Sequence, residues 1–372
     1  MSVKYRADQV GSLLRPKEIL EARRNPSATP EQLKEIEDRQ IRRILERQRD
    51  TGLKIFTDGE LRRGGFMSDF YESVTGIDRG EGVSRSWKGA ASAGAAGSSS
   101  HVSLPGVVTA KIQQKRRMAK HELDFLKKHS PGDIKITLPT PNQFPAITYK
   151  KGVSDRAYGT VSEFLWDLVP VFRAEIQALI REGVKYLQID APRYSYYIDP
   201  KWRKYIQEEM GQDPEQALDE AIRVDNACLE GARKKGVTLA IHLCRGNNRS
   251  QWYAEGGYDP IAEKLFTQLN VDAFLLEYES ERAGTFEPLR FVPRGKIVVL
   301  GLVSSKVPDM ESPDQLLRRI EEASRYVPME NLALSPQCGF ASSLEGNLLT
   351  EEQQWRKLQL VVDTARRAWG IL

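Results

Sequence analysis

Residues 237–244 read Val-Thr-Leu-Ala-Ile-His-Leu-Cys, a short apolar run that ends in a histidine and a cysteine. The run has the length and composition of a buried strand. Residues 214–235 before it form a helix-length segment, which opens with the N-cap and proline pair Asp213 and Pro214. A helix that leads into a buried strand is the repeating unit of a parallel α/β sheet. This stretch therefore predicts such a sheet, with His242 and Cys244 near the carboxyl end of one strand.

The same alternation runs along the whole chain of 372 residues. Eight strands are predicted, at 7–13, 53–57, 134–138, 186–190, 237–244, 273–277, 297–302 and 332–336. Helix-length segments lie between most of them, and Thr29 and Ser312 supply further N-caps before proline. Eight strands that alternate with helices predict a single TIM-type (β/α)8 barrel covering residues 1–372. An open doubly wound sheet is the alternative, but no Gly-rich dinucleotide loop follows the first strand.

One insertion interrupts this alternation. Residues 76–104 are rich in Gly, Ser, Ala and Arg, with Ala-Ala-Ser-Ala-Gly-Ala-Ala-Gly-Ser-Ser-Ser at the centre. Such small side chains bury little apolar area, so the segment is expected to be a flexible flap.

Composition excludes several classes of protein. The net charge of +4 arises from 55 basic and 51 acidic residues that are mixed along the chain, without the basic patch of a nucleic-acid binder. No apolar run is long enough to predict a membrane span, and the first residues contain no signal-peptide core. Three cysteines are too few for a disulfide framework. A cytoplasmic protein is expected.

Chemically useful side chains fall where the predicted strands end, which is where barrel enzymes place their active sites. They are Asp58, Glu60, Asp190, His242, Cys244, Glu277 and Cys338, with the backbone amides of Gly11 and Ser12 available to an anion after the first strand.

His242 and Cys244 carry the strongest chemical signal. Residues i and i+2 of a strand point to one face, so the imidazole and the thiolate can converge on one ion. Cys338 would add a second sulfur, and either Glu277 or Glu279 an oxygen, because both glutamates share one strand face. This donor set suits zinc, which would lower the pKa of a substrate thiol.

Six segments, in this order, carry a family resemblance: Asp8-Gln-Val-Gly-Ser12, Thr57-Asp-Gly-Glu60, Gln188-Ile-Asp-Ala-Pro192, His242-Leu-Cys244, the Glu277 region and Ser335-Pro-Gln-Cys-Gly339. Together they resemble the catalytic barrel of cobalamin-independent methionine synthase over essentially the whole chain. The resemblance implies a barrel of the methionine synthase and uroporphyrinogen decarboxylase type.

The resemblance also implies roles for individual residues. His242, Cys244, Glu277 and Cys338 would hold zinc. Glu60 and Asp190 would bind the amino group of homocysteine, and Val10, Gly11 and Ser12 would receive its carboxylate.

Three departures from the family pattern bear on the reaction. The full-length synthases have two barrels, and the half that helps to hold the folate donor has no counterpart in this chain. Lys306 stands where the family usually has a histidine proposed to help proton transfer, so a catalytic role or an anion-binding role is expected for it. Gln337 replaces an aspartate before Cys338.

The resemblance favours a zinc-dependent S-methyltransferase that converts homocysteine to methionine, with a methylated folate, a methylated corrinoid protein or another small methyl compound as donor. A second hypothesis keeps the metal and changes both substrates, as in epoxyalkane:coenzyme M transferases. There Lys306, Arg245 or Arg249 would hold a sulfonate. A third is a non-enzymatic protein that binds zinc or a corrinoid partner. Ligands from separate strand ends favour catalysis over this third hypothesis.

Overall fold

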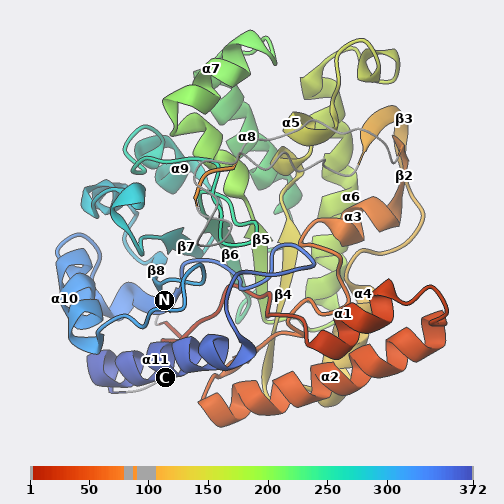
Figure 1. Ribbon diagram of the computed structural model, residues 1–372. Coiled ribbons are helices and arrows are strands. Elements are labelled where there is room, and N and C mark those ends of the chain that lie inside the picture. The colour runs from red at the N-terminus through yellow and green to blue at the C-terminus, as the bar shows by residue number, and fades with distance from the viewer. Residues whose placement is uncertain (1–2, 79–86, 90–105, 371–372) are drawn as a thin grey trace.

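Seven parallel strands form the central sheet of the protein (Figure 1). The structure is a computed structural model that describes residues 3–78, 87–89 and 106–370. In order across the sheet, the strands are β1 (Ile55–Phe56), β4 (Asp133–Pro139), β5 (Tyr186–Asp190), β6 (Thr238–Leu243), β7 (Ala273–Glu277), β8 (Ile297–Val303) and β9 (Leu332–Pro336). All neighbours pair in parallel, so their carboxyl ends meet at one edge of a curled sheet. The predicted parallel α/β sheet is confirmed.

Closure of this sheet into an eight-stranded barrel is not confirmed. The segment 7–13, predicted as the first strand, contributes one parallel bridge, between Ala7 and Leu334 of β9. On its other side it forms no ladder with β1 within the described ranges. The side chain of Gln9, rather than its backbone, donates to the carbonyl of Ile55 in β1 at 3.0 Å. Just past β1, Leu13 N donates to Gly59 O at 2.9 Å. The segment therefore contacts β1 and the turn after it without adding a strand ladder to the curled sheet.

Helices surround the sheet (Figure 1). The longer ones are α1 (Lys17–Arg24), α2 (Pro30–Thr51), α4 (Lys120–His129), α6 (Val161–Arg181), α7 (Pro200–Glu208), α8 (Pro214–Cys228), α10 (Pro313–Ser324) and α11 (Glu351–Trp369), and the shorter ones are α3 (Ser68–Ser73), α5 (Pro145–Thr148) and α9 (Ala262–Gln268). Side-chain caps at Thr29 and Asp213 begin α2 and α8 as predicted, whereas Ser312 makes no cap hydrogen bond. Among the described helices, none has the length and apolar character needed to cross a membrane.

An antiparallel pair of strands, β2 (Val74–Asp78) and β3 (Val107–Gln114), flanks the predicted insertion. Most of the insertion, and with it the expected flap, lies outside the described residues. Its described parts are 76–78, which belong to β2, and 87–89, which are fixed to the main body because Lys88 and Trp252 form an antiparallel bridge.

A group of buried polar side chains lies among the apolar residues of the inner face of the sheet, below the carboxyl edge. The Lys135 ammonium donates to Asp8 at 2.6 Å and to the Gln188 amide oxygen at 2.9 Å. The amide nitrogen of Gln188 in turn donates to Val10 O at 2.7 Å and to Asp190 Oδ1 at 2.8 Å. A buried polar network is costly unless its members are paired, and these pairs fix the orientation of Asp190 at the edge.

Candidate active site

His242, Cys244 and Cys338 meet at the carboxyl edge of the sheet. His242 lies in β6, Cys244 directly follows that strand and Cys338 follows β9, and their ligand atoms all lie within 4.8 Å of one another. All three residues are buried, and neither ring nitrogen of His242 has a hydrogen-bond partner. A buried imidazole without any partner is costly unless something else binds it. One nitrogen and two sulfur donors around a shared point form a possible metal site and suit zinc.

The two thiols of this group differ in acidity. Hydrogen bonding with the Cys244 thiol, helped by His242 and opposed by burial, holds the pKa of Cys338 well below its usual range. The same hydrogen bond and burial raise the pKa of Cys244. The group therefore favours one thiolate even before an ion binds, and a thiolate is the form that coordinates a metal.

Glu277 lies outside this group of three. It ends β7, is fully buried, and accepts hydrogen bonds from the Arg245 N–H at 2.8 Å and from Arg282 Nη2 at 2.8 Å. Burial would raise its pKa, but Arg282 and Arg245 outweigh burial and lower it, so the carboxylate is ionised. Glu279 also pairs with Arg282, and burial together with the charge of Glu277 raises its pKa to about 7.

Glu60 and Asp190 present buried carboxylates to the same cavity. Oε1 of Glu60 accepts a hydrogen bond from Thr137 at 2.8 Å, while its Oε2 has no partner. Burial, against the opposing charge of Arg63, raises the pKa of Glu60. Burial also raises the pKa of Asp190 to about 7. Two carboxyl groups that lack a full set of partners are suited to bind a cation such as an ammonium group.

Backbone geometry holds Glu60 in this position. It adopts a φ of +56°, in the left-handed region that non-glycine residues rarely occupy, directly after Gly59 at φ +66°. The carboxylate of Asp58 accepts a hydrogen bond from the Glu60 N–H at 2.9 Å. The turn after β1 thus directs the Glu60 side chain inward at some conformational cost.

Val10 and Ser12 line the cavity beside Glu60, and Gly11 joins them at φ +144°. A Cβ at Gly11 would lie 2.8 Å from Thr137 and 3.1 Å from Glu60, so only glycine fits without moving them. Ser12 lies against the loop that carries Cys338, since its hydroxyl accepts from Ala341 N at 3.3 Å.

Lys306 is buried behind the cavity wall, and its ammonium is already bonded. It donates to Gly246 O at 2.8 Å, Asn247 Oδ1 at 3.0 Å and Gln251 O at 3.3 Å. These contacts tie the loop after β8 to the loop after β6. The structure thus places Lys306 as a support of the 246–251 loop, and its catalytic role stays a prediction.

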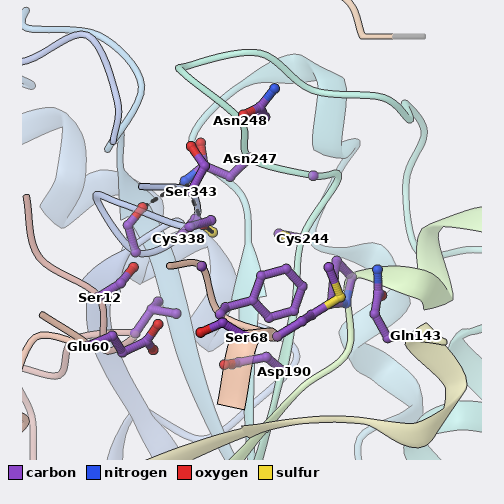
Figure 2. A pocket seen from close by; sticks show the side chains of 18 of the residues that line it. Ser12, Glu60, Ser68, Gln143, Asp190, Cys244, Asn247, Asn248, Cys338 and Ser343 are labelled. Carbon is purple, nitrogen blue, oxygen red and sulfur yellow. Dashed lines mark hydrogen bonds between the residues drawn. The ribbon is translucent and has the colours of Figure 1, made fainter. Parts of the chain in front are cut away.

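These elements enclose one cavity of about 550 Å³. Figure 2 shows both cysteines, Glu60 and Asp190 around it, with Gln143 and Ser12 on opposite sides of the view. Sequence reasoning missed much of its wall, which includes Phe66, Tyr71, Trp87, Gln143, Asn247 and Tyr253. Trp87 was the one residue of this wall that the sequence could have pointed to, because a tryptophan is unusual inside an insertion of small residues. The other wall residues lie in ordinary loop sequence.

The fold and the cavity define a class of protein, an α/β protein with a His/Cys/Cys group that could hold a metal ion at the carboxyl edge of a parallel sheet. The model of the cobalamin-independent synthase catalytic domain matches residues 9–367. The chain therefore belongs to the cobalamin-independent methionine synthase family, a family of methyltransferases.

Similar proteins span nearly the full length of the chain. It is 40% identical to the uncharacterized protein YxjG and 38% identical to the uncharacterized protein YxjH of Bacillus subtilis, in both cases over 98% of this chain and 95% of the relative. It is 24% identical to a methionine synthase of Saccharolobus solfataricus, over 95% of this chain and 92% of that protein.

Two solved structures share the fold. A protein of Listeria monocytogenes described as a candidate vitamin-B12 independent methionine synthase matches with a TM-score of 0.73 and 32% identity, over 100% of this chain and 99% of that chain. A B12-independent methionine synthase from Shewanella sp. W3-18-1, in complex with selenomethionine, matches with a TM-score of 0.74 and 20% identity, over 97% of each chain.

Proposed function

We propose that this chain is a zinc-dependent S-methyltransferase that methylates the thiol of homocysteine to form methionine. The observation that carries the proposal is the group of His242, Cys244 and Cys338, with its unpartnered imidazole, in one cavity with Glu60 and Asp190. When held by these residues, zinc acts as a Lewis acid that favours the thiolate form of a substrate thiol near neutral pH.

Glu277 is the proposed fourth ligand, ahead of Glu279. Glu277 ends β7, and its charge acts on both His242 and Cys244. A carboxylate has about four lone-pair sites, so Glu277 can bind an ion and keep its contact with Arg282. Arg282 would then hold the carboxylate in place, as outer partners of metal ligands commonly do.

Glu60 and Asp190 bind the ammonium group of homocysteine in this proposal, and Val10, Gly11 and Ser12 receive its carboxylate. The unpartnered Glu60 Oε2 supports the first assignment, because it is an acceptor that a substrate N–H would satisfy. Lys306 holds the 246–251 loop against the cavity, and participation in proton transfer is a further role proposed for it.

The alternative thiol, coenzyme M, fits less well because it carries a sulfonate. Among the described residues that line the cavity there is no lysine or arginine. Arg245 is buried and bonded to Gly256 O, Lys306 is bonded to loop oxygens, and Arg249 is exposed. Two carboxylates beside a sulfonate would repel it, so an amino-acid thiol is favoured.

The test is zinc stoichiometry and X-ray absorption at the zinc edge, with and without homocysteine. One zinc per chain, with a sulfur added to its shell by homocysteine, is expected. Cys338→Ala should lose that zinc, whereas Cys228→Ala, which alters a buried core cysteine on α8, should keep it. If no zinc binds, or if coenzyme M adds the sulfur and homocysteine does not, the proposal is wrong.

A further inference from the structure

An aromatic wall forms the part of the cavity made by loops. Phe66, Tyr71, Trp87 and Tyr253 line it. The rings of Trp87 and Tyr253 pack edge to face with their centres 5.1 Å apart. Trp87 is only 9% exposed, and the bridge between its neighbour Lys88 and Trp252 fixes it there. The wall is therefore a built surface, supplied by three separate segments of the chain.

The charged side chains that line the cavity are acidic. Its described lining contains three carboxylates, those of Glu60, Glu72 and Asp190, and neither lysine nor arginine. Arg63 lies behind Glu60 at 3.5 Å but is shared with Glu122 at 2.6 Å and Asp69 at 3.0 Å. Glu72 is exposed and pairs with Arg116 at 3.0 Å, so Glu60 and Asp190 are the buried acidic groups of the lining. The described lining holds no lysine or arginine that would repel a positively charged second ligand.

Two residues that line this part of the cavity carry buried polar atoms without partners among the described residues. The carboxamide oxygen of Gln143, a residue 1% exposed, accepts no hydrogen bond, and the indole N–H of Trp87 donates none among the described residues. Buried groups of this kind are normally satisfied, so a ligand is expected to complete them. Gln143 adds a further negative dipole, and Trp87 offers one donor to a polar end of the ligand.

We propose that this aromatic and acidic part of the cavity binds the methyl donor, and that the donor is a small methyl onium compound, a sulfonium or a quaternary ammonium ion. The faces of Trp and Tyr rings attract such cations, and nearby carboxylates strengthen the attraction. A polyanionic donor would meet repulsion from the same residues. The inference rests on the proposed function, since it names the second substrate of the same site.

The step balances without a further reactant. The thiolate sulfur of homocysteine attacks a methyl carbon of the onium ion, so that a new S–C bond forms and the C–S⁺ or C–N⁺ bond breaks. The electron pair of the broken bond stays on the leaving group, which departs as a neutral thioether or tertiary amine. The thiol proton goes to solvent. Because this leaving group needs no proton, Lys306 can remain on its three loop oxygens throughout.

Binding is tested first, without homocysteine, by calorimetry with choline and with its neutral carbon isostere 3,3-dimethylbutan-1-ol. Choline should bind at least about tenfold more tightly. Trp87→Leu and, separately, Glu72→Gln should reduce that preference, and Trp166→Leu should not, because Trp166 is 40% exposed on α6. Equal binding of the two compounds to the wild-type protein would overturn the inference.

Transfer is tested next with (2-hydroxyethyl)dimethylsulfonium carrying deuterated methyl groups, with zinc-loaded protein and mass detection of labelled methionine. Label in methionine is expected, and Trp87→Leu should raise the KM for the sulfonium about tenfold while the KM for homocysteine stays unchanged. If a methylated folate or a methylated corrinoid protein supplies the methyl group and the sulfonium does not, the inference fails and the proposed function stands. If none of the three donors methylates homocysteine, the inference fails. The proposed function fails with it if homocysteine also adds no sulfur to the zinc shell.

Discussion

Replacing Glu60 by glutamine removes one negative charge from the cavity and keeps the shape of the side chain. Glu60 is 3% exposed, and its Oε2 is the free acceptor assigned to the homocysteine ammonium. A hydrogen bond to a charged group contributes about 1.5–3 kcal/mol. Loss of about 2 kcal/mol corresponds to roughly thirtyfold weaker binding of homocysteine.

The fold should tolerate Glu60→Gln. Arg63 keeps Glu122 and Asp69 as partners, so no buried cation is left unpaired. Burial raises the pKa of Glu60, which means that its ionised form lowers stability as pH rises above the ordinary glutamate value. At pH 7 the glutamine variant should therefore unfold at the same temperature as the wild type or higher.

The assay is calorimetric titration of zinc-loaded protein with homocysteine and with 4-mercaptobutyrate, which lacks only the amino group. The wild type should prefer homocysteine by roughly thirtyfold, and Glu60→Gln should remove most of this preference. Glu122→Gln is the matched control, because it also changes a carboxylate on Arg63 but lies outside the cavity lining. If Glu60→Gln weakens both thiols equally, Glu60 does not bind the ammonium group and the assignment is refuted.

Three further changes test other parts of the site. Gly339→Ala would place a Cβ 2.0 Å from the Ser12 hydroxyl, so homocysteine affinity should fall at least about tenfold in calorimetry while circular dichroism stays unchanged. The pKa of Asp190, raised to about 7 by burial, predicts that the KM for homocysteine increases as pH falls below 7, and Asp190→Asn should abolish this dependence in initial-rate profiles. Lys306→Met leaves Asn247 and two loop carbonyls without their donor, so thermal unfolding should show that the free energy of unfolding falls by about 2 kcal/mol. A shifted pH profile of kcat in this variant would reveal an additional role of Lys306 in proton transfer.

The strands were largely predictable because each is a continuous apolar run bounded by polar residues. The predicted ranges 186–190, 273–277 and 332–336 agree with β5, β7 and β9. Whether the sheet closes into a barrel could not be predicted from such runs. Segment 7–13 meets β1 through the Gln9 side chain, a contact that the apolar pattern does not contain.

Residues on strand ends were predictable in position, because the side-chain period of a strand fixes which of them converge. His242 and Cys244 illustrate this. The hydrogen-bond and ion-pair partners of these residues were not predictable. Lys306 has its ammonium on three oxygens of a loop about 60 positions earlier in the chain, and Glu277 pairs with Arg282. Such pairings depend on how loops fold back onto the sheet.

The two sides of the cavity therefore differ in origin. The side of the cavity assigned to the thiol substrate is formed by His242, Cys244 and Asp190, which lie at strand ends of the sheet. The opposite wall, with Trp87 and Tyr253, stands on connecting segments, which tolerate change far better than strands do. A change in these segments would alter the second ligand and leave thiol activation intact. Members of this family that share the strand-end residues are expected to share the acceptor chemistry, whereas the donor has to be determined from the loops of each chain.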